Sequence, residues 1–129
     1  MEFVAFYNEA LRLMVDRKVE APRRQAIRFV VHNGHPRYHV SYKRAYEVVR
    51  QLLRSGKTPT NNSLQVQMWQ ELAGRVGTLC RDTGMSIAGA LEFVLAHCRA
   101  TRFYISERHA DSILDRARKQ YRQRKLRRL

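Results

Sequence analysis

The 129-residue sequence predicts a mainly α fold with two similar helix–helix–strand–helix halves. A short two-stranded antiparallel sheet joins the halves, and the chain ends in a basic helix or tail. Three observations predict this fold. Apolar residues recur at helical spacing along most of the chain. Two extended segments, PRYHVS (36–41) and TRFYIS (101–106), share the same order of residue types. A run of turn formers, SGKTPTNNS (55–63), separates the halves.

The first half spans about residues 3–55 and contains three predicted helices. The second helix begins near Pro22, because proline fits the first turn of a helix. The third begins after Ser41, whose hydroxyl can accept hydrogen bonds from the free N–H groups of the first turn. One apolar face of the first helix contains Phe3, Phe6, Tyr7, Ala10, Leu11 and Met14, and that of the third contains Ala45, Val48, Val49, Leu52 and Leu53.

The second half, about residues 64–120, repeats this order. Ser86 and Ser106 occupy the N-cap positions of its second and third helices. The segment ALEFVLAH (90–97) matches AIRFVVH (26–32) with one residue inserted. We therefore predict a single domain, residues 1–129, built by internal duplication, because three helices alone would bury too little surface. The apolar positions of the first and last helices of this half are Leu64, Met68, Trp69, Leu72, Val76 and Leu79, and Ala110, Ile113, Leu114 and Ala117.

The extended segments alternate between two faces, as strands do. Tyr38 and Phe103 lie on the face expected to be buried, whereas Arg37 and Arg102 lie on the opposite face. A lone strand leaves its backbone groups without partners. Two copies in one chain can pair with each other across a pseudo-twofold axis, so we expect an antiparallel ribbon with its arginines facing outward.

Charge is the strongest compositional feature. The chain has 25 Lys and Arg against 11 Asp and Glu, a net charge of +14. The stretch RARKQYRQRKLRRL (116–129) contains eight of the basic residues and no acidic residue, and residues 1–115 keep a net charge of +6. Residues 118–129 are predicted to form a basic tail. Such a surface attracts polyanions: nucleic acid, anionic lipid or an acidic protein.

The ribbon and the charge together predict a small nucleic-acid-binding protein, with DNA as the favoured ligand and an accessory or regulatory role. A two-stranded ribbon with outward basic side chains fits the major groove of DNA, and helix N-termini can hold phosphates. Over about a tenth of the chain the arrangement resembles ribbon-helix-helix DNA-binding proteins, although there the strand precedes both helices. The candidate nucleic-acid-binding residues are Arg37, His39, Lys43, Arg44, Arg102, Tyr104, Arg108, Arg118, Lys119, Arg122, Arg124 and Lys125.

The alternative function is an interaction module that docks an acidic protein partner, and homo-oligomer formation stays open. We expect no enzyme, because no catalytic constellation and no glycine-rich phosphate loop occurs. His32, His35 and His39 span a helix end, a turn and a strand and need not converge, so we expect no metal and no cofactor. Cys80 and Cys98 form no CxxC pair, which predicts reduced thiols in a cytoplasmic protein. No run of 18 apolar residues could span a membrane.

Overall fold

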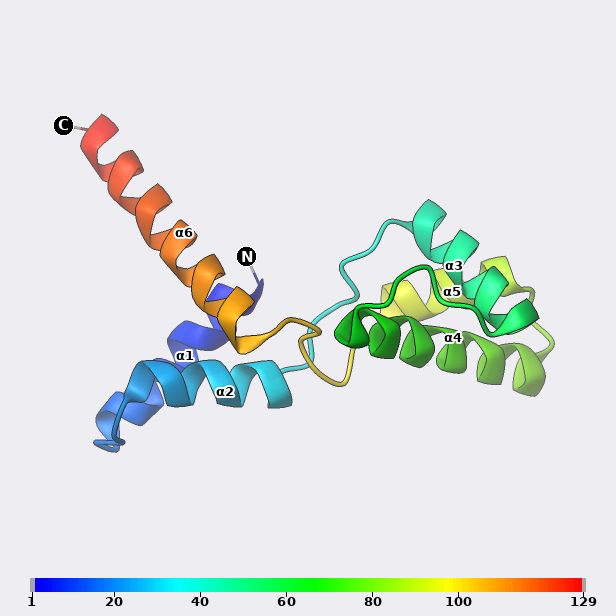
Figure 1. Cartoon of the computed structure of the whole chain (residues 1–129), viewed down its shortest axis with the longest axis horizontal. Helices are drawn as coiled ribbons and strands as arrows, with labels where there is room; N and C mark the ends of the chain where they lie inside the picture. The colour runs from blue at the N-terminus through cyan, green and yellow to red at the C-terminus, as the bar shows by residue number, and fades with distance from the viewer. Residues whose placement is uncertain (1, 129) are drawn as a thin grey trace. The chain divides into compact units, whose positions relative to one another are not determined.

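The computed structural model describes residues 2–128, which form six helices that cluster into two compact units (Figure 1). The first unit consists of the chain up to Gly34 and from Ile105 onward, and the second of His35–Tyr104. The helices are α1 (Glu2–Asp16), α2 (Pro22–Asn33), α3 (Tyr42–Ser55), α4 (Ser63–Thr83), α5 (Ile87–His97) and α6 (Glu107–Arg127).

No strand forms anywhere between residues 2 and 128, so the predicted two-stranded antiparallel sheet is wrong. The two extended segments do meet, and the Ala100 N–H donates to the Pro36 carbonyl at 2.7 Å. Pro36 has no N–H to return that bond. The next N–H along the second segment, that of Thr101, turns to the Glu71 carboxylate at 3.0 Å, and the chain bends there. A ladder of backbone hydrogen bonds therefore cannot develop.

Two side chains of α4, one helical turn apart, replace the missing sheet; we call Glu71 and Arg75 the α4 clamp. Besides the Thr101 N–H, Glu71 accepts a hydrogen bond from the Tyr104 hydroxyl at 2.8 Å. Arg75 donates to the Arg99 carbonyl and lies 5.8 Å from the centre of the Tyr38 ring. The two charged side chains are themselves 3.6 Å apart. The clamp thus contacts both extended segments and pairs backbone groups that strands would otherwise pair.

The predicted inward positions of the extended segments are confirmed although the strands are not. Tyr38 and Phe103 are buried, with 7% and 5% of their surface exposed, whereas Arg37 and His39 are exposed. The predicted outward face of the second segment is wrong, because Arg102 and Tyr104 are half-buried and Tyr104 packs against the core. The alternation therefore identified the most deeply buried side chain of each segment. It did so because an extended chain lying on helices has the same two-residue period as a strand in a sheet.

The second unit is a three-helix body in which α3 and α5 pack on α4. Its N-caps are the predicted serines: Ser41 accepts from Arg44 N and Ser86 accepts from Gly89 N. The predicted connector is confirmed as the irregular segment between α3 and α4. The most completely buried side chains come from all three helices and include Ala45, Val49, Leu72, Val76, Ala90 and Leu91.

The first unit is also a three-helix body, in which α6 packs on both α1 and α2. Pro22 begins α2 as predicted, and Ser106 caps α6 by accepting from His109 N at 3.0 Å. The buried side chains of this unit are Phe3, Tyr7, Ala10, Ala26, Ile27, Val30, Val31, Ala110 and Leu114.

The third helix of each predicted half packs in the body formed by the other half. The half that begins with α1 and α2 contributes α3 to the second unit, and the half that begins with α4 and α5 contributes α6 to the first. Each extended segment is therefore the connection along which the chain passes from one unit to the other. Internal duplication itself stays a prediction.

The two glycines inside α4 are not equivalent, which gives a first prediction. A Cβ at Gly74 would meet nothing within 4 Å, whereas a Cβ at Gly77 would lie 3.2 Å from Cδ2 of Leu53 on α3. Gly74→Ala should raise the free energy of unfolding by about 0.5–1 kcal/mol through helix propensity. Gly77→Ala should raise the free energy of unfolding by less than Gly74→Ala does, or should lower it, because the added Cβ crowds Leu53. Urea unfolding followed by fluorescence of the single tryptophan, Trp69 of α4, measures both. Equal gains would show that Leu53 does not restrict Gly77.

Removing the carboxylate of the α4 clamp gives a second prediction. Glu71→Ala should lower the free energy of unfolding of the second unit by about 2–3 kcal/mol, because it leaves the Thr101 N–H and the Tyr104 hydroxyl without their acceptor. Glu71→Gln keeps one acceptor oxygen and should lose less. The control is Glu92→Ala, an exposed carboxylate of the same unit. A loss below about 0.5 kcal/mol for Glu71→Ala would show that the clamp does not stabilise the fold.

Candidate nucleic-acid interface

The twelve candidate residues divide equally between the two units. The second unit contains the members from the extended segments and from the start of α3: Arg37, His39, Lys43, Arg44, Arg102 and Tyr104. The first unit contains the α6 members: Arg108, Arg118, Lys119, Arg122, Arg124 and Lys125.

Within the second unit, Arg102 and Tyr104 make contacts with neighbouring residues. Arg102 is half-buried, donates from Nε to the Phe103 carbonyl at 3.0 Å and lies 5.8 Å from the centre of the Tyr104 ring. Tyr104 is bound to the α4 clamp. The ribbon that was to present Arg37 and Arg102 to a DNA groove is absent. Arg102 and Tyr104 therefore have a structural role in holding the second segment.

The start of α3 presents exposed cations with one nearby carboxylate. Lys43 and Arg44 are exposed in the first turn, and Arg44 lies 3.9 Å from Glu47. Farther along the same helix, Arg50 and Arg54 are exposed as well. Neither was singled out from the sequence, although they continue the polar face opposite the apolar positions of this helix.

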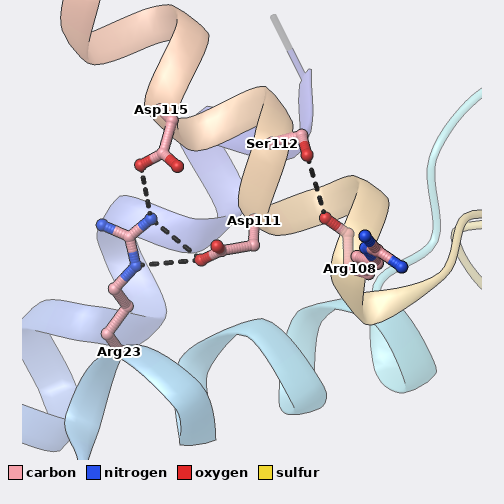
Figure 2. A network of polar contacts seen from close by, with 5 residues as sticks. All are labelled: Arg23, Arg108, Asp111, Ser112 and Asp115. Atoms are coloured by element: carbon pink, nitrogen blue, oxygen red, sulfur yellow. Dashed lines mark hydrogen bonds and ion pairs between the residues drawn. The ribbon is translucent and has the colours of Figure 1, made fainter.

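In the first unit, ion pairs with α2 neutralise the acidic residues of α6. Arg23 donates to Asp111 at 2.9 Å and to Asp115 at 3.0 Å (Figure 2). The hydrogen bond with Asp111 raises the pKa of Arg23, against the opposing effect of its partial burial. In Figure 2 the Arg108 side chain points away from this cluster. Glu107 is likewise held, 3.6 Å from Arg28 and 3.5 Å from His32.

The C-terminal half of α6 is left as an uncompensated basic helix. Every described residue from Arg118 to Arg128 is exposed, and the helix continues beyond α1 and α2 (Figure 1). Within the described chain, no carboxylate forms an ion pair with a cation of α6 from Arg116 onward. Cations at this end are favourable for the helix itself, because the helix dipole places partial negative charge there. The predicted tail is thus an ordered helical surface with cations on every side.

An open groove, which was not predicted from the sequence, lies between α1 and this part of α6. Its volume is about 780 Å³. Tyr121 lies on its α6 wall and is 66% exposed. The groove lining contains three arginines and no acidic residue. We call this the α1–α6 groove; its lining residues are Val4, Ala5, Tyr7, Asn8, Leu11, Arg23, Leu114, Ala117, Arg118, Gln120, Tyr121 and Arg124.

The residues that could support other chemistry are not assembled into a site. Among residues 2–128, no three His, Cys, Asp or Glu side chains are grouped closely enough to hold a metal ion. His35 Nδ1 lies 3.2 Å from the Ala100 carbonyl. Cys80 and Cys98 are free, half-buried thiols. None of the helices in the described chain is both long and apolar enough to traverse a bilayer.

Comparisons of the chain with protein-family models, with curated proteins and with solved structures gave no match. The fold and the site therefore define only a class, a small helical protein with an exposed basic helix.

The tyrosines beside the α4 clamp have perturbed ionisation. Burial raises the pKa of Tyr38 well above its ordinary value of 10.0, and the negative charge of Glu71 raises it further. Burial also raises the pKa of Tyr104, whose hydroxyl donates a hydrogen bond to Glu71. The Tyr38 hydroxyl is buried and has no hydrogen-bond partner among the described residues. Both phenols are therefore more stable in their neutral form in the folded protein.

A raised phenol pKa makes the second unit sensitive to alkali, which gives a third prediction. Tyr38 contributes full stability below pH 10, the unfolded value, and this contribution is lost as pH rises toward the folded value. Between about pH 10 and 11 the wild type should lose up to about 1.4 kcal/mol more than Tyr38→Phe. Near pH 8 the variant should be about as stable as the wild type, because the lost hydroxyl has no partner.

The measurement is urea unfolding at several pH values, followed by Trp69 fluorescence. Tyr42→Phe, at a ring that is 44% exposed, controls for the loss of a phenol from the same unit. The same pH dependence in wild type and Tyr38→Phe would contradict the burial of a neutral phenol at this position.

Proposed function

We propose that this protein binds nucleic acid, with DNA as the favoured ligand, through the basic half of α6, and that it has a non-catalytic accessory or regulatory role. The observation that supports this most is the uncompensated run of cations on the exposed C-terminal half of α6. Lys and Arg that neutralise phosphates release counterions, and this release supplies most of non-specific binding to nucleic acid. Two free cysteines agree with a reducing compartment, so we include a cytoplasmic location in the proposal.

The position of the cations supports nucleic acid over a general role in solubility. The acidic residues of α6 are confined to its first half, where they pair with α2. A surface that served solubility alone would intersperse both signs. Beyond Arg116, α6 has only one sign of charge. The α3 cations Lys43, Arg50 and Arg54 add a second, weaker basic surface on the other unit.

Neutralising α6 gives a fourth prediction. In the test variant Arg118, Lys119, Arg122, Arg124 and Lys125 are changed to Gln, which preserves helix propensity. Affinity for duplex DNA should fall. The slope of log affinity against log salt should also become shallower by up to about 4.5, since each lost phosphate contact contributes about 0.9. Fluorescence anisotropy across a salt series measures both quantities, and circular dichroism checks that the helices remain.

The matched control removes the same number of charges elsewhere. It replaces Arg12, Arg17, Arg24, Lys57 and Arg81, all exposed and outside both basic surfaces, with Gln and should keep most of the affinity and the slope. Equal losses in both variants would mean that overall charge, and not α6, determines binding. If the wild type fails to bind DNA at about 50 mM salt, the proposed function is wrong, and an acidic protein partner becomes the better explanation of the charge.

A further inference from the structure

The α1–α6 groove has apolar walls that are open to solvent. Leu114 and the buried ring of Tyr7 line the groove, and Val4 and Leu11 line it from α1. Tyr121 continues the apolar lining along α6. Apolar surface gains free energy when a ligand covers it. A ligand of this groove should therefore present apolar faces as well as negative charge.

Tyr121 lies among cations in a way that suits a planar ligand. Arg118 and Arg124 are three residues away on either side, so each of them lies next to Tyr121 on the helix surface, and all three side chains line the groove. Of the three arginines in the lining, Arg23 is held by Asp111 and Asp115, whereas Arg118 and Arg124 form no ion pair within residues 2–128. An exposed aromatic ring is thus flanked by two available guanidinium groups.

We infer that the α1–α6 groove binds unstacked bases, so that the preferred ligand of this protein is single-stranded nucleic acid. The inference rests on the proposed function and specifies its ligand class. Proteins that bind single strands combine a basic groove that follows the phosphates with aromatic side chains that stack on the bases. Here Tyr121 supplies the aromatic face, and Arg118 and Arg124 supply the charges.

Other occupants fit the groove less well. A duplex keeps its bases paired and stacked, so it can offer phosphates to α6 but no apolar face to the groove. A second copy of this chain would oppose a net charge of +14 with the same charge. An acidic amphipathic helix would cover the groove, but the cations continue beyond it to Arg128. A strand with one negative charge per nucleotide can follow this whole length of α6.

The test compares a labelled single-stranded DNA of about 20 nucleotides with the duplex of the same sequence, using the full chain at one salt concentration. The wild type should prefer the single strand. Tyr121→Ala should weaken single-strand binding by about 5- to 150-fold and should change duplex binding by less than about two-fold. Tyr121→Phe retains an aromatic ring and should bind the single strand like the wild type. Because Tyr121 is 66% exposed, these substitutions remove little core.

A matched pair on the opposite wall gives an independent measurement. Asn8 lies in the groove lining and is exposed on α1. Asn8→Glu and Asn8→Gln have nearly the same size and differ in charge. The glutamate should weaken single-strand binding more than duplex binding, and the glutamine should not.

The outcomes separate this inference from the proposed function. If Tyr121→Ala binds the single strand as tightly as the wild type, or loses equally on both probes, the groove does not bind bases, while α6 still binds nucleic acid. If neither probe binds to the wild type, the proposed function itself is wrong. A wild type that prefers the duplex would also overturn the inference.

Discussion

Glu71 is the residue on which the arrangement of the second unit depends. Both of its carboxylate oxygens accept hydrogen bonds from the second extended segment, and Arg75, one turn later, holds the Arg99 carbonyl and covers the Tyr38 ring. Buried or half-buried backbone groups require partners, and here side chains of a helix supply them in place of a neighbouring strand. Between residues 2 and 128 the two extended segments therefore form no sheet, and their backbone is held instead by Glu71 and Arg75 of α4.

Much of the fold could be predicted from the sequence, because its determinants are local. Ser41, Ser86 and Ser106 are N-caps as predicted, and the burial of Tyr38 and Phe103 follows the two-residue alternation. The sheet was wrong because alternation shows which side chains face inward but not what pairs with the backbone. The partner of the Thr101 N–H is a carboxylate 30 residues away, and no periodicity encodes that choice.

Part of the candidate site could also be predicted from the sequence, and part could not. The cations of α6 are evident in the composition, and the structure leaves all of those from Arg118 onward exposed. The neutralisation of the α6 acids was not predictable, because Arg23 and Asp111 are 88 residues apart. They meet because α6 packs with α1 and α2. The same packing creates the α1–α6 groove. The position of Tyr121 in the lining of that groove could therefore be seen only in the structure.

The central claim is that α6 and its groove, and not the distributed charge, form the nucleic-acid-binding surface. The most direct measurement is a nuclear magnetic resonance titration of the ¹⁵N-labelled full chain with single-stranded DNA, which follows each backbone amide separately. We expect the shift changes to concentrate between Arg116 and Arg128 and at the α1 residues of the groove, including Asn8 and Leu11. The amides of α3 around Arg50 should change little. Changes centred on α3, or spread evenly over all basic segments, would contradict the claim.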